Sequence, residues 1–260
     1  MIKVGRQQVS NDVESQQALW DNYWRSGAAR YAPHDDIVDR VRQIAGPGAT
    51  ALEIGAGLGV DILAVASFGY EAIALDISKE ALRLIRSKAE SRVKNLHLVA
   101  ADAFHLPFKN DSLDLIFHQG VMEHFPDPDP FLCEQKMALK TGGTIMADVP
   151  QTYTLYTLRK RWAIRRGKWF AGWETQYTPG ALRQTVARAG FEVIETYGRD
   201  YDIPLFRYIS RIERIGLNRY GRPIIPWVIR KPVGWLNGLF EKTRLSLYFR
   251  QCIGVVGVKR

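Results

Sequence analysis

Short apolar runs alternate with longer amphipathic segments through the middle of the chain. The apolar runs have the length and composition of buried strands. They predict strands at Thr50–Ile54, Ala72–Leu75, Leu96–Ala100, Leu113–Phe117 and Gly143–Val149. Helical spacing predicts the intervening helices at Val60–Phe68, Lys79–Arg92 and Asp129–Leu139. Strands that alternate with helices form a parallel sheet with helices on both faces, so the pattern predicts an α/β fold.

The pattern changes toward both ends of the chain. Trp20, Tyr23 and Trp24 recur at helical spacing, so residues 1–45 are predicted as a helical lid. A helix from Pro179 to Gly190 precedes further strands at Phe191–Thr196 and Gln251–Val258. The predicted organisation is a lid at 1–45, an α/β domain at 46–199 with a basic insertion at about 151–176, a basic aromatic insertion at 200–249 and a final core strand at 250–260.

A glycine-rich turn follows the first predicted strand, in the sequence Leu52-Glu53-Ile54-Gly55-Ala56-Gly57-Leu58-Gly59. Glycines at alternate positions let the backbone approach a ligand without a Cβ in the way. The next helix adds unpaired N–H groups and the positive end of its dipole. Such a turn predicts a site for a nucleoside-containing cofactor. A dinucleotide site usually has the spacing G-x-G-x-x-G, so an oxidoreductase is disfavoured.

An acidic residue ends the second predicted strand. Asp76 lies 21 residues after Gly55 and is followed by Ile77. A carboxylate at this place can accept hydrogen bonds from both hydroxyls of a ribose. The third strand is likewise followed by an acid, in Ala101-Asp102-Ala103. Taken alone, Glu53, Asp76 and Asp102 could each be an ordinary acid at a strand end or in a turn.

Several motifs in a fixed order resemble the class I S-adenosylmethionine-dependent methyltransferases that act on small molecules. The motifs are E-x-G-x-G-x-G at 53–59, Pro107-Phe108 with Ser112–Ile116, Gln119–His124, Lys140–Gly143, and Tyr177-Thr178-Pro179 with Ala189-Gly190-Phe191. The resemblance covers about residues 45–198. It implies a Rossmann-like sheet of about seven strands, mostly parallel, with the last strand antiparallel and helices on both faces.

The resemblance also implies that S-adenosyl-L-methionine is the cofactor. Its amino-acid end would lie on the glycine turn, its ribose at Asp76 and its adenine amino group at Asp102. The predicted cofactor-binding residues are Glu53, Gly55, Ala56, Gly57, Asp76, Ile77, Asp102, Ala103 and Gln119. For Gln119, a solvated position in a loop is an equally open alternative to contact with the methionine part of the cofactor.

Methyl transfer chiefly requires alignment of nucleophile, carbon and sulfur. A hydroxyl or amine nucleophile also benefits from a nearby base. His124 and Tyr177 are the predicted catalytic residues, and His118 is a further candidate. His124 is the best placed of the three, although the alternative is that it only orients its loop. Polyprenyl-quinone O-methyltransferases hold a divalent ion with a similar Glu-His pair, but Gly120 replaces the additional acid, so no metal is expected.

Charge and tryptophan are concentrated in the second part of the chain. The net charge is +9, yet the first 150 residues are acidic overall and the rest is strongly basic. Five tryptophans lie in that second part: Trp162, Trp169, Trp173, Trp227 and Trp235. Three interpretations stay open. They are an anionic membrane surface with a lipid-linked substrate, a groove that stacks RNA bases, and a substrate lid whose outer face is basic.

The predicted function is methyl transfer to an oxygen or nitrogen of a small or amphiphilic metabolite. In one interpretation this metabolite is lipid-linked. Motifs for methylating base amino groups or cytosine carbon 5 are absent, which weakens an RNA methyltransferase as the alternative. A non-catalytic cofactor-binding regulator or scaffold is the other alternative. The unpaired spacing of Cys133 and Cys252 and the polar N-terminus predict a cytoplasmic protein, peripheral at the inner face of the membrane if the basic segments bind lipid. The sequence leaves the oligomeric state open.

Overall fold

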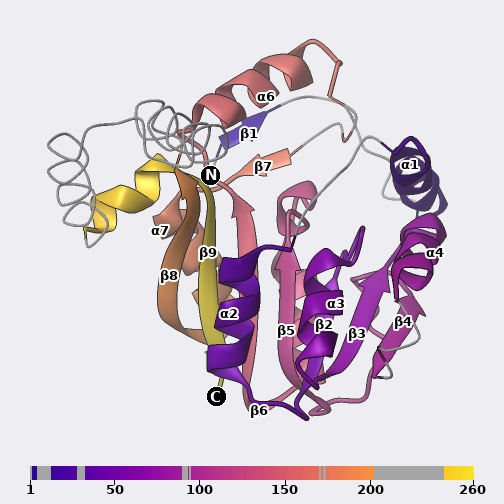
Figure 1. The fold of residues 1–260 in the computed structure, drawn as a ribbon. Helices are drawn as coiled ribbons and strands as arrows, with labels where there is room; N and C mark the ends of the chain where they lie inside the picture. Colours follow the sequence, from indigo (N-terminus) through magenta and orange to yellow (C-terminus); the bar gives the residue numbers. More distant parts are fainter. Residues whose placement is uncertain are drawn as a thin grey trace, which may run out of the picture.

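A seven-stranded sheet lies at the centre of the protein. The computed structural model describes residues 2–4, 13–27, 33–89, 93, 95–169, 171, 174–201 and 243–260. The strand order is β4-β3-β2-β5-β6-β9-β8 (Figure 1). The strands are β2 (Thr50–Ile54), β3 (Glu71–Asp76), β4 (Leu96–Ala100), β5 (Leu113–Gln119), β6 (Leu139–Pro150), β8 (Phe191–Tyr201) and β9 (Arg250–Lys259). β2 to β6 pair in parallel, whereas β9 is antiparallel to both its neighbours, which confirms the predicted Rossmann-like sheet.

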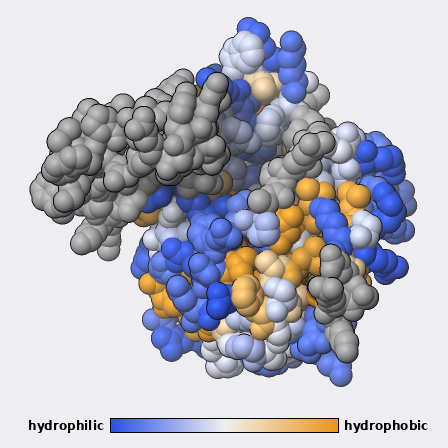
Figure 2. Space-filling view, in the orientation of Figure 1, coloured by the Kyte–Doolittle hydropathy of each residue, from blue (hydrophilic) through white to orange (hydrophobic). Residues whose placement is uncertain are grey.

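Helices cover both faces of this sheet. α2 (Asp35–Ile44), α3 (Val60–Ser67) and α4 (Lys79–Lys88) pack on one face, and α5 (Asp129–Ala138) and α7 (Pro179–Arg188) on the other. α1 (Val13–Arg25) lies outside the sheet against α4 (Figure 1). Ser78 and Thr178 cap α4 and α7 with their hydroxyl oxygens, which confirms the predicted helix starts. On the face seen in Figure 2, α2 presents hydrophilic side chains while apolar ones gather over α3.

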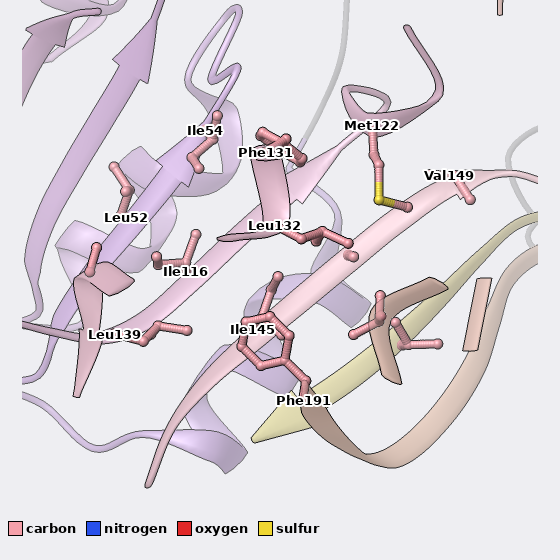
Figure 3. Packing of buried hydrophobic residues seen from close by; sticks show 14 of the residues in the cluster. Leu52, Ile54, Ile116, Met122, Phe131, Leu132, Leu139, Ile145, Val149 and Phe191 are labelled. Atoms are coloured by element: carbon pink, nitrogen blue, oxygen red, sulfur yellow. The ribbon is translucent and has the colours of Figure 1, made fainter. Parts of the chain in front are cut away.

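Aliphatic and aromatic side chains fill the space between the sheet and the helices. Beneath α5, Leu52 and Ile54 of β2 and Ile116 of β5 meet Phe131 and Leu132 of the helix, all at most 1 % exposed (Figure 3). A second cluster fills the opposite face under α2, α3 and α4. Strands that are apolar on both faces are typical of a parallel sheet, and this is why they stand out in the sequence.

A small cap covers the carboxyl ends of the parallel strands. It comprises β1 (Ile2–Val4) and β7 (Glu174–Gln176), which pair antiparallel, together with α6 (Leu155–Arg165) and the 3₁₀ helix η1 (Met122–His124). In Figure 1 α6, β1 and β7 lie above the upper end of the sheet. A further 3₁₀ helix, η2 (Arg244–Phe249), leads into β9. The glycine turn, Asp76 and Asp102 lie at the same end of the sheet, so cofactor and acceptor would meet beneath this cap.

Some predicted boundaries differ from the structure. Residues 2–4 form a strand within the predicted helical lid, because they pair with β7 in the cap. α2 belongs to the core rather than to a lid, since Ile37 and Val41 are buried against the sheet. The Lys140–Gly143 motif, which precedes the strand predicted at Gly143–Val149, forms part of β6, which pairs with β5 from Leu139 onward across an irregularity. Residues 90–92, Trp173 and residues 202–242, with Trp227 and Trp235, lie outside the described residues.

Candidate functional site

The glycine turn follows β2 and is held against β3. Gly55, Gly57 and Gly59 have positive φ angles of 67°, 53° and 66°, a conformation that other residues rarely adopt. The N–H of Gly55 donates to the carbonyl of Leu75 at 2.8 Å. A Cβ on Gly57 would lie 2.6 Å from the ring of Trp24. The turn therefore needs glycine both for its conformation and for its close packing.

Asp76 joins the end of β3 to the glycine turn. Its Oδ2 accepts from the N–H of Gly57, and its Oδ1 accepts from the N–H of Ser78, each at 2.8 Å. Burial raises the pKa of Asp76 to about 6, although the Ser78 and Gly57 N–H groups oppose the shift. Each carboxylate oxygen retains acceptor capacity beyond these bonds. The carboxylate is thus fixed where it can accept from a nearby pair of hydroxyls.

Glu53 anchors the helix that follows the turn. Its Oε2 accepts from the N–H of Ile62 in the first turn of α3, at 3.1 Å. Burial, then the charge of Asp61, raises its pKa well above the ordinary value. Ala56 is buried within the turn that this contact holds. Glu53 therefore supports the shape of the predicted cofactor site from beneath.

Asp102 lies at the end of β4, the strand next to β3. Its Oδ1 accepts from the N–H of Phe104 at 3.0 Å, and its Oδ2 lies 3.2 Å from Nδ1 of His105. Its side chain is 22 % exposed, so the carboxylate remains open to a ligand. The half-buried Ile77 and Ala103 follow the same two strands. The structure thus brings the predicted ribose and adenine contacts to one edge, called here the cofactor edge together with the glycine turn.

Helix α1 crosses over this edge. The ring of Trp24 lies against Gly57, and Asp21 accepts from the hydroxyl of Ser78 at 2.5 Å. Trp20 meets His124 edge to face, with ring centroids 5.2 Å apart. One helix therefore touches both the cofactor edge and the loop after β5, as the predicted lid would.

The three predicted acid–base candidates occupy different surroundings. His124 is half-buried in η1 beside α1. Tyr177 is fully buried, burial raises its pKa, and its hydroxyl has no hydrogen-bond partner among the described residues. His118 packs on Phe131 in the core, and burial lowers its pKa to about 3. Of the three, His124 alone is partly exposed, whereas Tyr177 and His118 pack among hydrophobic side chains of the core.

Gln119 lies in a chain of polar side chains at the end of β5. Its Nε2 donates to Asp61 at 2.6 Å, and its Oε1 accepts from Nη2 of Arg199 at 2.9 Å. Arg199 also pairs with the buried Asp148, at 3.2 Å from Nε. Asp61 in turn accepts from the backbone N–H of His34, at 2.6 Å. These contacts disfavour a solvated loop position for Gln119 and place it beside the start of α3.

A buried charged cluster lies between η1 and the cap. Lys160 of α6 pairs with Glu174 of β7, and both side chains are at most 3 % exposed. Glu123 is buried near this pair. Burial, and then the charge of Glu174, raises the pKa of Glu123 to about 8. Its Oε2 has no hydrogen-bond partner among the described residues, and the same holds for Oε1 of Gln176. Unpaired buried oxygens are uncommon in folded proteins and mark a place where a ligand's donors could bind.

Sequence reasoning missed most of these polar residues. Arg199 is 80 residues from Gln119, and Lys160 is 14 residues from Glu174 on a different element. Among these polar residues, only Glu123 and His124 were recognisable from the local sequence, as an adjacent Glu-His pair. The basic residues of 151–168 suggested a solvent-exposed surface, whereas Lys160 among them is buried.

No group of three or more His, Cys, Asp or Glu side chains in the described part of the chain is arranged to hold a metal ion. Among those same residues, every helix is too short or too polar to span a bilayer.

Comparisons with known proteins agree with this geometry. Residues 52–147 match the family model of a methyltransferase domain. Malonyl-[acyl-carrier protein] O-methyltransferase of Methylococcus capsulatus is 32 % identical over 130 residues, 49 % of this chain and 47 % of the relative. Ubiquinone biosynthesis O-methyltransferase of Cereibacter sphaeroides is 24 % identical over 156 residues, 58 % of this chain and 63 % of the relative. The match therefore spans about half to three-fifths of these curated relatives.

Solved structures show the same fold. Phosphoethanolamine N-methyltransferase 2 of Haemonchus contortus, in complex with S-adenosyl-L-methionine, aligns with a TM-score of 0.59 and 18 % identity, over 97 % of this chain and 58 % of that one. The sheet order, the glycine turn with Asp76 and the matching domain lead to one conclusion: residues 52–147 form the core of a class I S-adenosylmethionine-dependent methyltransferase domain.

Proposed function

We propose that this protein transfers a methyl group from S-adenosylmethionine to an oxygen or nitrogen atom of a small or amphiphilic metabolite. The observation that carries the proposal is the cofactor edge, where Asp76 is held by Gly57 and Ser78 beneath α1. Relatives named for O-methylation and a structural neighbour named for N-methylation support both acceptor atoms.

The residues of the cofactor edge suit this cofactor. The glycines of the turn carry no Cβ of their own, with Trp24 packed against Gly57 and Val121 against Gly55, and Asp76 has spare acceptor capacity for the ribose. Asp102 would receive the adenine amino group, and Ile77 and Ala103 would flank the ring. When bound, the cofactor supplies an electrophilic methyl group on its sulfonium sulfur. The contribution of the chain is alignment and exclusion of water.

The acceptor would enter between the loop after β5 and the cap. Glu123 and His124 lie on this loop, and Glu123 has an unpartnered carboxylate oxygen. A hydroxyl or protonated amine must lose a proton as it is methylated. We propose that the carboxylate of Glu123 takes this proton and that His124 orients the acceptor beside Trp20.

Transfer of a labelled methyl group tests the proposal. The protein is incubated with methyl-labelled S-adenosylmethionine and host extract, and the products are separated into lipid, polar small-molecule, nucleic acid and protein fractions. Protein-dependent label in either of the first two fractions is expected, with much less label for Asp76→Ala. Label confined to nucleic acid would favour the RNA methyltransferase. Tight binding of S-adenosylhomocysteine with no transfer to any fraction would favour the regulator or scaffold.

A further inference from the structure

Exposed apolar side chains gather on α6 and just before it. Leu155, Leu158 and Trp162 are 48 %, 53 % and 55 % exposed. Their spacing of three and four residues places them on one face of the helix. The opposite face, with Thr157 and Lys160, is buried in the cap. α6 therefore directs a stripe of large apolar side chains away from the protein.

The 3₁₀ helix η2 extends this stripe. Leu245 is 59 % exposed and Phe249 is 40 % exposed. The rings of Tyr153 and Tyr248 stack with centroids 6.2 Å apart, and Nε2 of Gln151 donates to the carbonyl of Tyr248 at 2.9 Å. These contacts join the two segments into one surface. The exposed apolar residues of 153–162 and 245–249 are called here the α6–η2 surface.

Cations flank the stripe on α6. The exposed Arg159 and Arg166 lie on one side of it by helical position, and Arg161 and Arg165 on the other. The guanidinium of Arg166 lies 3.6 Å from the centroid of the Trp162 ring. The sequence contains no Asp or Glu from 151 to 173, so these positive charges have no acid beside them in the chain. The surface is thus apolar at its centre and positive at its rim.

We propose that the α6–η2 surface docks the protein on a membrane that contains anionic lipids. Apolar side chains of a surface helix insert at the boundary of headgroups and acyl chains. Arginine at the rim reaches the phosphates, and tryptophan and tyrosine suit the headgroup level. An RNA groove would use cations and stacking aromatics. The exposed leucines are neither cations nor stacking aromatics, so their presence favours binding to a bilayer over binding to RNA.

The surface lies at the same end of the sheet as the candidate site (Figure 1). Gln151, which contacts η2, directly precedes Thr152, whose N–H donates to the carbonyl of Tyr177 at 2.9 Å. Docking would therefore bring the cap and the acceptor side toward the bilayer. This last step rests on the proposed function and suits an amphiphilic acceptor that resides in the inner leaflet. The docking itself depends only on the surface.

Flotation with vesicles tests the docking. The full chain is mixed with vesicles of phosphatidylcholine alone or with 30 % phosphatidylglycerol, at low and at high salt. We expect flotation with the anionic vesicles at low salt and a decline as salt increases, because the attraction is partly Coulombic. Absence of flotation, or flotation that neither anionic lipid nor salt affects, would overturn the proposal.

Two double variants locate the contact. Leu158→Ser with Trp162→Ser should lower vesicle affinity by about tenfold or more, since both apolar contacts are lost. Met137→Ser with Ile194→Ser removes comparably exposed apolar side chains elsewhere and should change affinity less than about twofold. Equal losses in the two variants, or binding to an RNA oligomer in place of vesicles, would contradict the assignment.

Binding of S-adenosylhomocysteine is measured for each variant. Unchanged affinity shows that the fold and the cofactor edge are intact, so a loss of flotation then belongs to the surface. If flotation behaves as expected but no methyl transfer is found, the docking stands and the proposed function fails. If transfer occurs and flotation does not, the docking fails alone.

Discussion

The cofactor edge and the cap are held together by different kinds of contact. At the cofactor edge, backbone N–H groups of the glycine turn and of Ser78 bind a carboxylate at the end of the neighbouring strand. In the cap, side chains from separate elements meet, such as Lys160 of α6 and Glu174 of β7. The first arrangement follows from a short motif, and the second only from the folded chain. The cofactor edge can therefore be predicted from a short stretch of sequence, whereas the contacts of the cap depend on which elements the fold brings together.

The largest effect is expected from breaking the buried ion pair of the cap. Lys160→Met leaves Glu174 charged and buried, which should lower the free energy of unfolding by about 3–5 kcal/mol. The measurement is urea denaturation at pH 7. The double variant with Glu174→Gln should regain most of the loss. Folded Lys160→Met should still bind S-adenosylhomocysteine as the wild type does; weaker binding would mean that the two regions are coupled.

The sequence predicted the core fold well because the parallel strands are apolar on both faces. It also predicted the glycine turn and Asp76, whose contacts lie within one strand–turn–helix unit and its neighbour. It did not predict that Gln119 would bind Arg199, or that Lys160 would be buried, because such pairs depend on which elements the fold brings together. β1 was missed for the same reason, since three residues become a strand only by pairing with β7.

Replacing Glu123 should separate chemistry from cofactor binding. Glu123→Gln removes the proposed proton acceptor, so kcat should fall by about 10²-fold with little change in the KM for S-adenosylmethionine. Because burial raises the pKa of Glu123 to about 8, wild-type kcat should rise with pH up to about 8. The variant should lack this rise, whereas Glu123→Asp should retain part of it. Equal loss at every pH would point to a purely structural role.

Replacing Asp76 tests the cofactor edge directly. Asp76→Ala removes the proposed acceptor of both ribose hydroxyls and the observed acceptor of the Gly57 and Ser78 N–H groups. The affinity for S-adenosylhomocysteine should fall by more than about tenfold, corresponding to roughly 1–3 kcal/mol. Titration calorimetry gives the dissociation constant, and circular dichroism shows whether the fold is kept. Unchanged affinity would refute the assigned ribose contact.

The smallest expected effect is the pH dependence of cofactor affinity, which sharpens the contrast with the cap. Asp76 has a raised pKa of about 6, so its carboxylate is ionised above pH 6 and gains a proton as the pH falls through 6. The ionised form is the better acceptor for ribose hydroxyls. Affinity for S-adenosylhomocysteine should therefore fall by about fourfold between pH 7.5 and 5.5. Asp76→Asn cannot titrate and should show a flat profile over the same range. A wild-type profile that is flat, or that changes only near pH 8 where Glu123 titrates, would mean that the cap rather than the cofactor edge controls binding.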